Sequence, residues 1–409
     1  MDFEDSPEEA AFRAEVRAWL AATVLSFASR PDAGEAERVR VARAWMAEKA
    51  KAGYVGFTLP VSLGGRGGSA IEEVIFMEEQ ARVAAPHIET FNLGPGTAIP
   101  TLMKHAHPEH VALLAAPTLR GEIVWCQLFS EPGAGSDVAA IRTRAIREGD
   151  EWVVNGQKVW TSGAHVADWG LLLTRSDPAV PKHRGLTFFI FDMKSPGVSV
   201  RPLKQMSGRA EFNEVFFTDL RIPDHQRLGE VNGGWQVVLT TLSNERLALI
   251  GDRTVGRNLV APLIRLAARI PTPDGGSLLD DSAFCDRLAS YYATVAGVDH
   301  IRKRIFTTLS RGVPPGAEAT IGKMTLARAL QEMAAFGMDI AGTAGQILDE
   351  SADPDLAEIH DCFLTAPGYR MGGGTEEIGK NIIAERVLGL PQDIRVDKQV
   401  PFNRAVAHE

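Results

Sequence analysis

The sequence predicts an α+β protein in which a helical segment, a β segment and a second helical segment follow one another along the chain. Apolar residues recur at helical spacing near the start, β-prone runs separated by turns fill the middle, and long helical patterns return after Asn232. The chain has no repeat or low-complexity tract and no linker long enough to free a domain. We therefore expect three domains, at residues 1–120, 121–230 and 231–409.

The first segment is predicted as helices. Pro7 followed by two glutamates is a typical helix start, and Phe12, Val16 and Leu20 keep the helical spacing behind it. Further helices are expected near residues 35–51, 69–84 and 108–116, separated by turn-rich stretches at 59–68 and 92–100.

The middle segment is predicted as a β domain that ends near Pro223. EWVVNGQKVW, residues 151–160, has β-prone residues on both sides of Asn155-Gly156, a pair typical of a hairpin turn. Similar β-prone runs follow in GLTFFIFDM, VSVRPL and EFNEVFFTDLRIP.

The last segment is predicted as long helices. Residues 235–270 contain no helix-breaking residue before Pro262. Later helices are expected at about 283–310, 317–345 and 375–388, and Gly389 and Pro391 end the last of them.

Composition limits the classes of function. Of the 409 residues, 45% are hydrophobic and 23% charged, the net charge is −9, and no Lys/Arg-rich block is present. A nucleic-acid or membrane-surface role is therefore disfavoured, because both need a basic footprint. The acidic start lacks the apolar stretch of a signal peptide, and no apolar run is long enough to span a bilayer. We expect a cytoplasmic protein.

The cysteines and histidines do not predict a metal site. Cys126, Cys285 and Cys362 are far apart and odd in number, so each is expected to fill core space in a reducing compartment. HAHPEH, residues 105–110, holds three histidines, but a proline interrupts it and no other ligand cluster accompanies it. We interpret it as a solvated turn and expect no metal.

Two segments of the β region have the character of a ligand pocket. FSEPGAGSD, residues 129–137, is a strand running into a glycine-rich turn that brings backbone amides and hydroxyls to a flat or phosphorylated ligand. KVWTSGAH, residues 158–165, places Trp160 beside hydroxyls at a strand end, where the indole can wall a flat-ring pocket. Taken singly, a plain β-turn and a core tryptophan are the simpler readings.

The segment MGGGTEEIGKN, residues 371–381, contains three consecutive glycines before a helix. Such a run usually lets backbone N–H groups approach a ligand, but Glu376 and Glu377 in the first turn would repel a phosphate. The ligand that approaches these glycines must therefore be of another kind.

The helix expected from Trp235 carries charges where apolar residues are expected. Arg246 and Arg253 fall near the centre of its apolar stripe, and Glu245 falls on the flank of that stripe. Charges on a core-facing stripe are costly unless they are paired or used. An internal ion pair explains them as well as a functional role does.

In combination, these segments resemble the acyl-CoA dehydrogenase family. FSEPGAGSD, KVWTSGAH, EVFFTDLRIP and GGTEEIGKNIIAERVLGLP stand in the order and at roughly the spacing of that family's signature segments, and the likeness covers nearly the whole chain. The resemblance implies an N-terminal helical domain, a middle β-barrel and a C-terminal four-helix bundle. It also implies FAD bound between the β domain and the last helices, and α,β-dehydrogenation of an acyl-CoA to a trans-2-enoyl-CoA with hydride transfer to flavin N5.

The resemblance also implies roles for individual residues. Trp160 stacks near the isoalloxazine, with Thr161 beside it and Ser162 hydrogen-bonded near N5. The other residues expected at the cofactor are Gln127, Phe129, Ser130, Ser136, Gly342 in AGTAGQ, Thr375 and Glu377. The family's Arg-x-x-Phe-Gly flavin contact is absent, and Arg287 is expected as a loose substitute for it. The residues expected to contact the substrate are Ser136, Ser243, Arg246 and Gly373, whose backbone N–H helps to bind the thioester carbonyl.

The catalytic base departs from the commonest pattern of the family. Many members carry a glutamate directly before a Gly-Thr pair, and here that position is Gly373. A smaller group, which includes isovaleryl- and long-chain-type enzymes, carries the base on the earlier helix directly before an arginine. Glu245-Arg246 matches that location. Glu245 is therefore the predicted base.

Three enzymatic interpretations remain open for a chain with these features. The first is a homodimeric or homotetrameric dehydrogenase of acyl-CoA catabolism that passes electrons to an electron-transfer flavoprotein. The second is the catalytic subunit of a heteromeric dehydrogenase, which the missing cross-interface motif favours. The third is a flavin-dependent oxidase or monooxygenase on the same scaffold. A non-enzymatic protein would have no use for an acid on a core stripe. The acyl group cannot be predicted beyond an expectation that it is branched or bulky.

Overall fold

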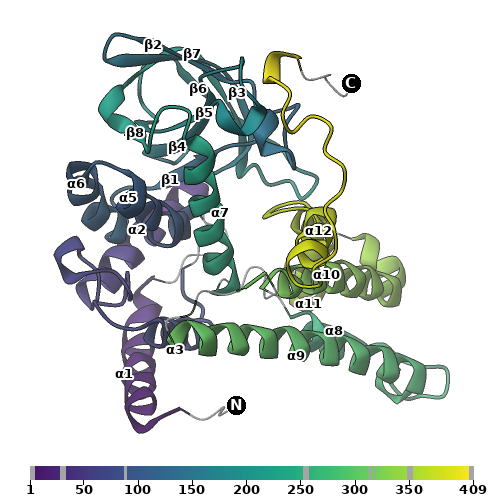
Figure 1. Ribbon diagram of the computed structural model, residues 1–409. Helices are drawn as coiled ribbons and strands as arrows, with labels where there is room; N and C mark the ends of the chain where they lie inside the picture. The colour runs from purple at the N-terminus through teal and green to yellow at the C-terminus, as the bar shows by residue number, and fades with distance from the viewer. Residues whose placement is uncertain are drawn as a thin grey trace. The chain divides into compact units, whose positions relative to one another are not determined.

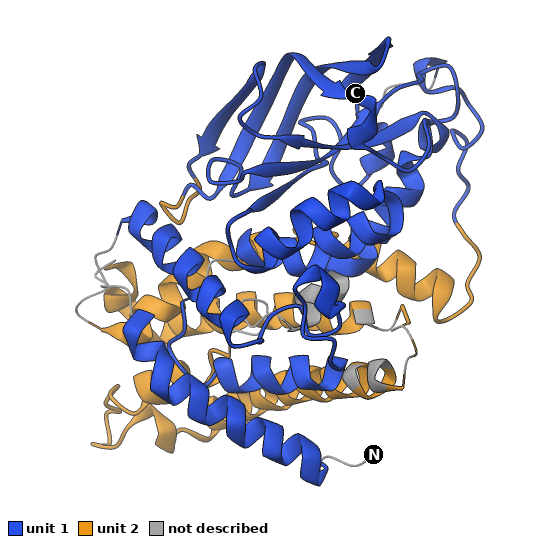
Figure 2. Ribbon diagram, turned by 90° about the vertical axis from the view of Figure 1, so that its left-hand side faces the viewer, with its two compact units in different colours: residues 1–204, 210–251, 393–409 blue, residues 205–209, 252–392 orange. Residues whose placement is uncertain are grey.

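The chain forms two compact units, shown in blue and orange in Figure 2. Unit 1 comprises residues 1–204, 210–251 and 393–409, and unit 2 comprises residues 205–209 and 252–392. The structure is a computed structural model that describes residues 5–27, 34–86, 90–251, 258–311, 313, 316–317, 319–347 and 353–404, with the backbone alone at 246–251, 306, 309–310 and 319.

The predicted N-terminal helices are confirmed in unit 1, but the prediction of a turn-rich stretch at 92–100 is wrong, because these residues are helical. Ser6 caps the first helix through a reciprocal pair of hydrogen bonds with Glu9, so the helix begins at Pro7 as the sequence predicts. The helices of this region are α1 (Pro7–Thr23), α2 (Glu35–Lys51), α3 (Ala70–Gln80), α4 (Thr90–Leu93), α5 (Ile99–His105) and α6 (Pro108–Leu119).

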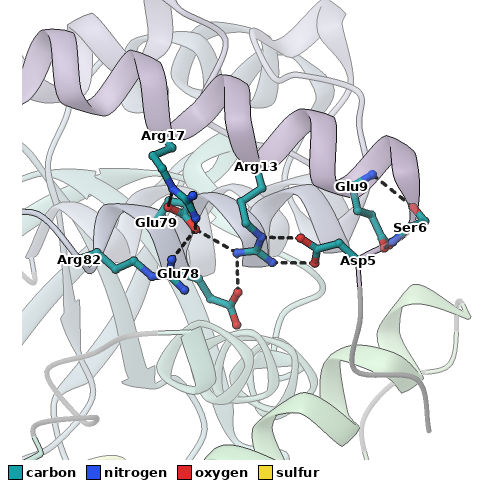
Figure 3. Close-up of polar contacts among 8 residues, drawn as sticks. All are labelled: Asp5, Ser6, Glu9, Arg13, Arg17, Glu78, Glu79 and Arg82. Carbon is teal, nitrogen blue, oxygen red and sulfur yellow. Dashed lines mark hydrogen bonds and ion pairs between the residues drawn. The ribbon is translucent and has the colours of Figure 1, made fainter.

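A charged cluster joins α1 to the end of α3 (Figure 3). The Glu79 carboxylate is only 2% exposed and lies 2.8 Å from Arg17, 3.2 Å from Arg13 and 3.1 Å from Arg82. The hydrogen bond from Arg17, and after it the one from Arg13, lowers the pKa of Glu79, so the carboxylate is ionised at neutral pH. One buried anion thus connects two helices far apart in sequence.

The middle of unit 1 is a single sheet of eight strands in the described part of the chain (Figure 1). Its order is β6-β7-β3-β2-β4-β5-β8, and β1 pairs in parallel with β4. The strands are β1 (Trp125–Leu128), β2 (Arg144–Glu148), β3 (Glu151–Ser162), β4 (Trp169–Arg175), β5 (Leu186–Asp192), β6 (Val198–Leu203), β7 (Phe212–Pro223) and β8 (Arg227–Leu228).

The two faces of this sheet bury different cores. Alternate residues of β4 and β5, such as Leu171 and Phe188, pack with residues of α5, α6 and the later helix α7 (Gly234–Gly251). The residues between them, such as Leu172 and Phe189, pack against β3 and β7. The sheet therefore encloses a core of its own. It is not a closed barrel, because its end strands β6 and β8 do not pair in the described residues.

The predicted hairpin at Asn155-Gly156 is wrong. Residues 151–162 form the one continuous strand β3, and a register shift against β7 falls between Val154 and Gly156. A Cβ at Gly156 would lie 2.5–2.8 Å from atoms of Thr143, so the glycine allows close approach rather than a turn. The Asn155 side chain hydrogen-bonds to Asp219 across the shift.

Unit 2 is helical, as predicted, and has its own core. Its helices are α8 (Val260–Ala267), α9 (Ser282–Ser310), α10 (Ala319–Ala341), α11 (Pro354–Tyr369) and α12 (Glu376–Arg386). The helical pattern at 235–270 corresponds to two helices, α7 and α8, and residues 252–257 between them lie outside the described residues. The sequence pattern missed α11, whose start is capped by Asp353 ahead of Pro354.

The cysteine prediction holds for two of the three thiols. Cys126 and Cys362 are buried, whereas Cys285 is exposed and donates to the Leu279 carbonyl. Within the described residues, no helix is both long and apolar enough to cross a membrane.

Candidate active site

The loop after β1 and the end of β3 are joined by a buried ion pair. The Lys158 ammonium, fully buried, lies 2.8 Å from the Glu131 carboxylate and donates to the Phe129 carbonyl at 3.0 Å. Glu131 also accepts from the backbone N–H groups of Arg142 and Thr143, at 2.6 and 2.9 Å. Burial alone would raise the pKa of Glu131, but the Lys158 charge and these hydrogen bonds outweigh it and lower that pKa. The pair fixes FSEPGAGSD against KVWTSGAH.

Trp160 is held in an unusual backbone conformation just beyond this pair. Its φ is +58°, in the left-handed region, and a register shift of β3 against β7 falls between Lys158 and Thr161. The indole is 61% exposed and contacts the Phe212 ring edge-on at 6.0 Å. Such a conformation persists only where the surroundings enforce it. The result is a large aromatic face presented to solvent at the end of a rigid strand.

A buried asparagine that the sequence analysis missed supports the next residue. The Asn213 amide donates to the Thr161 carbonyl at 2.9 Å, and its oxygen lies 3.1 Å from Nδ1 of His165, whose Nε2 lies 2.7 Å from the Glu35 carboxylate. The Thr161 hydroxyl is buried and has no hydrogen-bond partner among the described residues. Ser162 follows it, half-buried, at the strand end.

The FSEPGAGSD loop is anchored from a distant part of unit 1. Ser130 accepts a hydrogen bond from the Val159 N–H through its carbonyl oxygen, while Ser136 is exposed. The Lys182 ammonium lies 2.6 Å from both Asp137 and Asp397, and thus connects the residue after Ser136 to the segment beyond residue 393.

The predicted base lies beside another predicted site residue. Gln127 on β1 donates from Nε2 to Oε2 of Glu245 on α7 at 3.0 Å, and both side chains are half-buried. The Ser243 hydroxyl is exposed and donates to the Leu239 carbonyl of its own helix. The side chain of Arg246 and the whole of Arg253 lie outside the described residues.

In unit 2, Arg287 and Gly342 have clear local roles. The Arg287 guanidinium lies 4.3 Å from the centre of the Phe336 ring and donates to the Tyr291 hydroxyl at 3.1 Å. Gly342 has φ +57° and lies directly after the last residue of α10, where a left-handed residue is needed.

The glycine run before α12 has a conformational explanation. Gly373 and Gly374 have φ values of +65° and +98°, which residues with a side chain rarely adopt. Thr375 is the N-cap of α12 and accepts from the Ile378 N–H, and Glu377 is exposed. Glu376 is buried and paired with Arg370, which lowers the pKa of Glu376. That glutamate is committed to an ion pair.

Matches to known families cover most of the chain. Residues 6–122 match "Acyl-CoA dehydrogenase, N-terminal domain", residues 126–220 the middle domain and residues 232–388 the C-terminal domain. The acyl-CoA dehydrogenase IpdE1 of Mycobacterium tuberculosis is 35% identical over 392 residues, which are 94% of this chain and 98% of that protein. The acyl-CoA dehydrogenase FadE34 of the same organism is 38% identical over 80% of this chain, but the match spans only 44% of that longer protein.

Solved structures agree with this match. The ChsE4-ChsE5 complex from Mycobacterium tuberculosis superposes with a TM-score of 0.81 at 29% identity, covering 96% of this chain and 100% of that one. A structure named Tcur3481-Tcur3483 steroid ACAD gives a TM-score of 0.79 at 28% identity with the same coverage. The chain is thus an oxidoreductase with a helical–β–helical fold. It belongs to the acyl-CoA dehydrogenase family, whose reaction is the α,β-dehydrogenation of acyl-CoA thioesters.

The residues of unit 1 fit a flavin, the cofactor of that family. The exposed Trp160 indole offers a stacking face for a flat ring, and the Thr161 hydroxyl and the side-chain amide oxygen of Gln127 are buried polar atoms without a partner among the described residues. Both atoms have hydrogen-bonding capacity that a bound flavin can use.

Proposed function

We propose that this chain binds FAD without a covalent bond and dehydrogenates an acyl-CoA with Glu245 as the base. The observation that carries the proposal is the Gln127–Glu245 contact. Glu245 is the one acidic residue in the sequence of α7, and this contact places it beside β1, the strand that leads into FSEPGAGSD. The usual family position of the base is Gly373, which has no carboxylate.

The chemistry explains why a carboxylate is needed at that position. The α-C–H of an acyl thioester is a very weak acid, so its carbonyl must be polarised by preorganised N–H donors while a desolvated carboxylate takes the proton. We assign the proton to Glu245 and one carbonyl donor to the Gly373 N–H. Bound FAD supplies the acceptor for the β-hydride. Trp160 and Thr161 hold its ring, and Ser130, Ser136 and Ser162 provide further polar contacts.

Glu245→Gln tests the proposal. The variant should fold and bind FAD and acyl-CoA, but anaerobic bleaching of the flavin by substrate should slow by about 10²–10⁴-fold. Glu376→Gln is the matched control and should stay active, because Glu376 is paired with Arg370. Glu377→Gln should mainly affect cofactor affinity and leave bleaching by bound substrate in place. Near wild-type bleaching by Glu245→Gln, together with its loss in Glu376→Gln, would move the base to the glycine loop.

We further propose that the chain acts as the catalytic subunit of a heteromeric enzyme on a bulky acyl-CoA. Two similar structures bear names of paired proteins, ChsE4-ChsE5 and Tcur3481-Tcur3483, and the second is named a steroid ACAD. The absence of Arg-x-x-Phe-Gly around residues 272–285 supports the need for a partner chain. With an electron-transfer flavoprotein as acceptor, the enzyme should reduce that protein and not oxygen.

Two measurements test this second proposal. Flavin content should show less than one FAD per chain when the chain is expressed alone, and more after co-expression with a second acyl-CoA dehydrogenase-like chain. Light scattering gives the oligomeric state of both preparations. Polycyclic and branched acyl-CoAs should give higher kcat/KM than butyryl-CoA. One FAD per chain in a homo-oligomer would contradict the heteromeric assembly. A higher kcat/KM for butyryl-CoA would contradict the bulky acyl group.

A further inference from the structure

The contact between Gln127 and Glu245 fixes the orientation of both side chains. A carboxylate can only accept hydrogen bonds, so Gln127 must turn its NH₂ group toward Glu245 at 3.0 Å. The backbone of Gln127 is itself held, because β1 pairs in parallel with β4 and Gln127 stands opposite Leu171. The amide oxygen must therefore point away from the base.

That amide oxygen is unusual. It is buried and has no hydrogen-bond partner among the described residues, although the amide nitrogen on the same group is paired. A buried acceptor left unpaired costs about 1–3 kcal/mol. This amide oxygen can accept a hydrogen bond from an N–H donor of a bound ligand while the amide nitrogen stays on Glu245.

We propose that Gln127 is a positioning residue that orients the Glu245 carboxylate with its amide N–H and receives an N–H donor of the bound ligand on its amide oxygen. The inference rests on the proposed role of Glu245. Two parts of the ligands carry suitable N–H groups: the isoalloxazine ring of FAD and the pantetheine arm of the acyl-CoA. Gln127 would thereby connect occupancy of the site to the geometry of the base.

The neighbourhood of α7 contains other groups that titrate or carry charge. His105 on α5 lies 2.8 Å from the Thr240 hydroxyl, and His183 contacts the Trp235 ring edge-on. Both contacts are to earlier turns of α7 than Glu245. Other charged groups on α7, and on the described elements packed against it, include Lys104, Arg175, Lys182, Arg184, Asp192 and Arg246. They are the same in wild type and variants, so a difference between pH profiles isolates Gln127.

Gln127→Met tests the inference, because it keeps the length of the side chain and removes both polar atoms. Hydrogen bonds to an ionised carboxylate favour that form, so the acid limb of the pH profile for flavin reduction should move upward by about one to two pH units. Gln157→Met is the matched control, since Gln157 also donates to a glutamate, Glu214, at 2.9 Å, on β3 and β7. The control should leave the profile unchanged.

Binding measurements test the acceptor half. If the donor belongs to the flavin, Gln127→Met should weaken FAD binding to the apoprotein by about tenfold; if it belongs to pantetheine, binding of an enoyl-CoA product should weaken instead. Unchanged affinity for both ligands would overturn this half. An unshifted pH profile in Gln127→Met, with Glu245→Gln inactive, would overturn the positioning role while leaving the base assignment intact. Should Gln127→Met fail to fold, Gln127→Glu provides the isosteric alternative. It places a second carboxylate beside Glu245 and should raise the acid limb further.

Discussion

The Lys158 ammonium and the Glu131 carboxylate lie 2.8 Å apart with 0% and 8% of their side chains exposed, and they join two segments that are separate in sequence. Lys158 stands two residues before Trp160, and Glu131 follows Ser130 in the FSEPGAGSD loop. A pair so placed sets the position of both segments that we propose to contact the flavin. Its removal should therefore affect stability and cofactor binding together.

Lys158→Met should destabilise the protein by about 3 kcal/mol, because it leaves the Glu131 carboxylate buried without its cation. Chemical denaturation of the apoprotein measures this loss. The double variant Lys158→Met/Glu131→Gln should recover part of it, since it removes the unpaired buried charge, although the single glutamine oxygen can accept from only one of the Arg142 and Thr143 N–H groups, which in wild type donate to separate oxygens. Strict additivity of the two single variants would show that the pair is not coupled.

Trp160→Gly and Trp160→Ala should differ in stability but not in cofactor binding. Both lose the stacking face, so both should bind FAD more weakly than wild type. Only glycine adopts φ +58° without strain, so the apoprotein of Trp160→Gly should be more stable than that of Trp160→Ala by about 1 kcal/mol. Thermal unfolding of the apoproteins and FAD titration measure the two effects. Equal stability would mean that the strand end relaxes when the indole is removed.

The sequence was sufficient for the elements whose patterns are local. Ser6 with Glu9 starts α1, the β-prone middle became the sheet, and four signature segments identified the family. It failed where tertiary contact overrides local preference. Asn155-Gly156 is typical of a hairpin turn, but Thr143 packs against Gly156 and needs the missing Cβ. The helix α11 was missed although Asp353-Pro354 is a recognisable start.

The candidate site shows the same division. Gln127 and Glu245 were each predicted from family resemblance, but their mutual contact joins residues 118 positions apart and no sequence spacing indicates it. The Glu131–Lys158 pair could have been predicted from the spacing of β3. Lys158 is an even number of residues from Trp152 and Val154, so it lies on the same inward face of the strand, where a lysine needs a buried partner.

Glu79→Gln should weaken the protein mainly at neutral pH. The pKa of Glu79 is lowered in the folded state, so its contribution to stability is full above about pH 4.5 and is lost as the pH falls through the folded pKa. Replacing the charge should cost about 2 kcal/mol at pH 7 and flatten the acid side of the stability profile. Melting temperatures of both proteins from pH 7 to pH 3 give the comparison. Parallel profiles would show that the Glu79 charge is not responsible. Glu37→Gln is the control, because Glu37 is half-exposed and lies 2.6 Å from Arg40 on the surface of α2.

Gly373→Glu in the Glu245→Gln background should restore part of the flavin reduction, because it returns a carboxylate to the commoner family position. The rescue should be incomplete, since a side chain at φ +65° costs about 1–2 kcal/mol and shifts the loop that carries the Gly373 N–H. Gly373→Ala in the wild-type background is the matched control: it introduces the same backbone strain without a carboxylate. Single-turnover bleaching should rank wild type first, then Gly373→Ala, then the rescued double variant, and Glu245→Gln last. A double variant no faster than Glu245→Gln, with its FAD and acyl-CoA affinities intact, would show that a carboxylate at residue 373 cannot reach the α-proton in this chain.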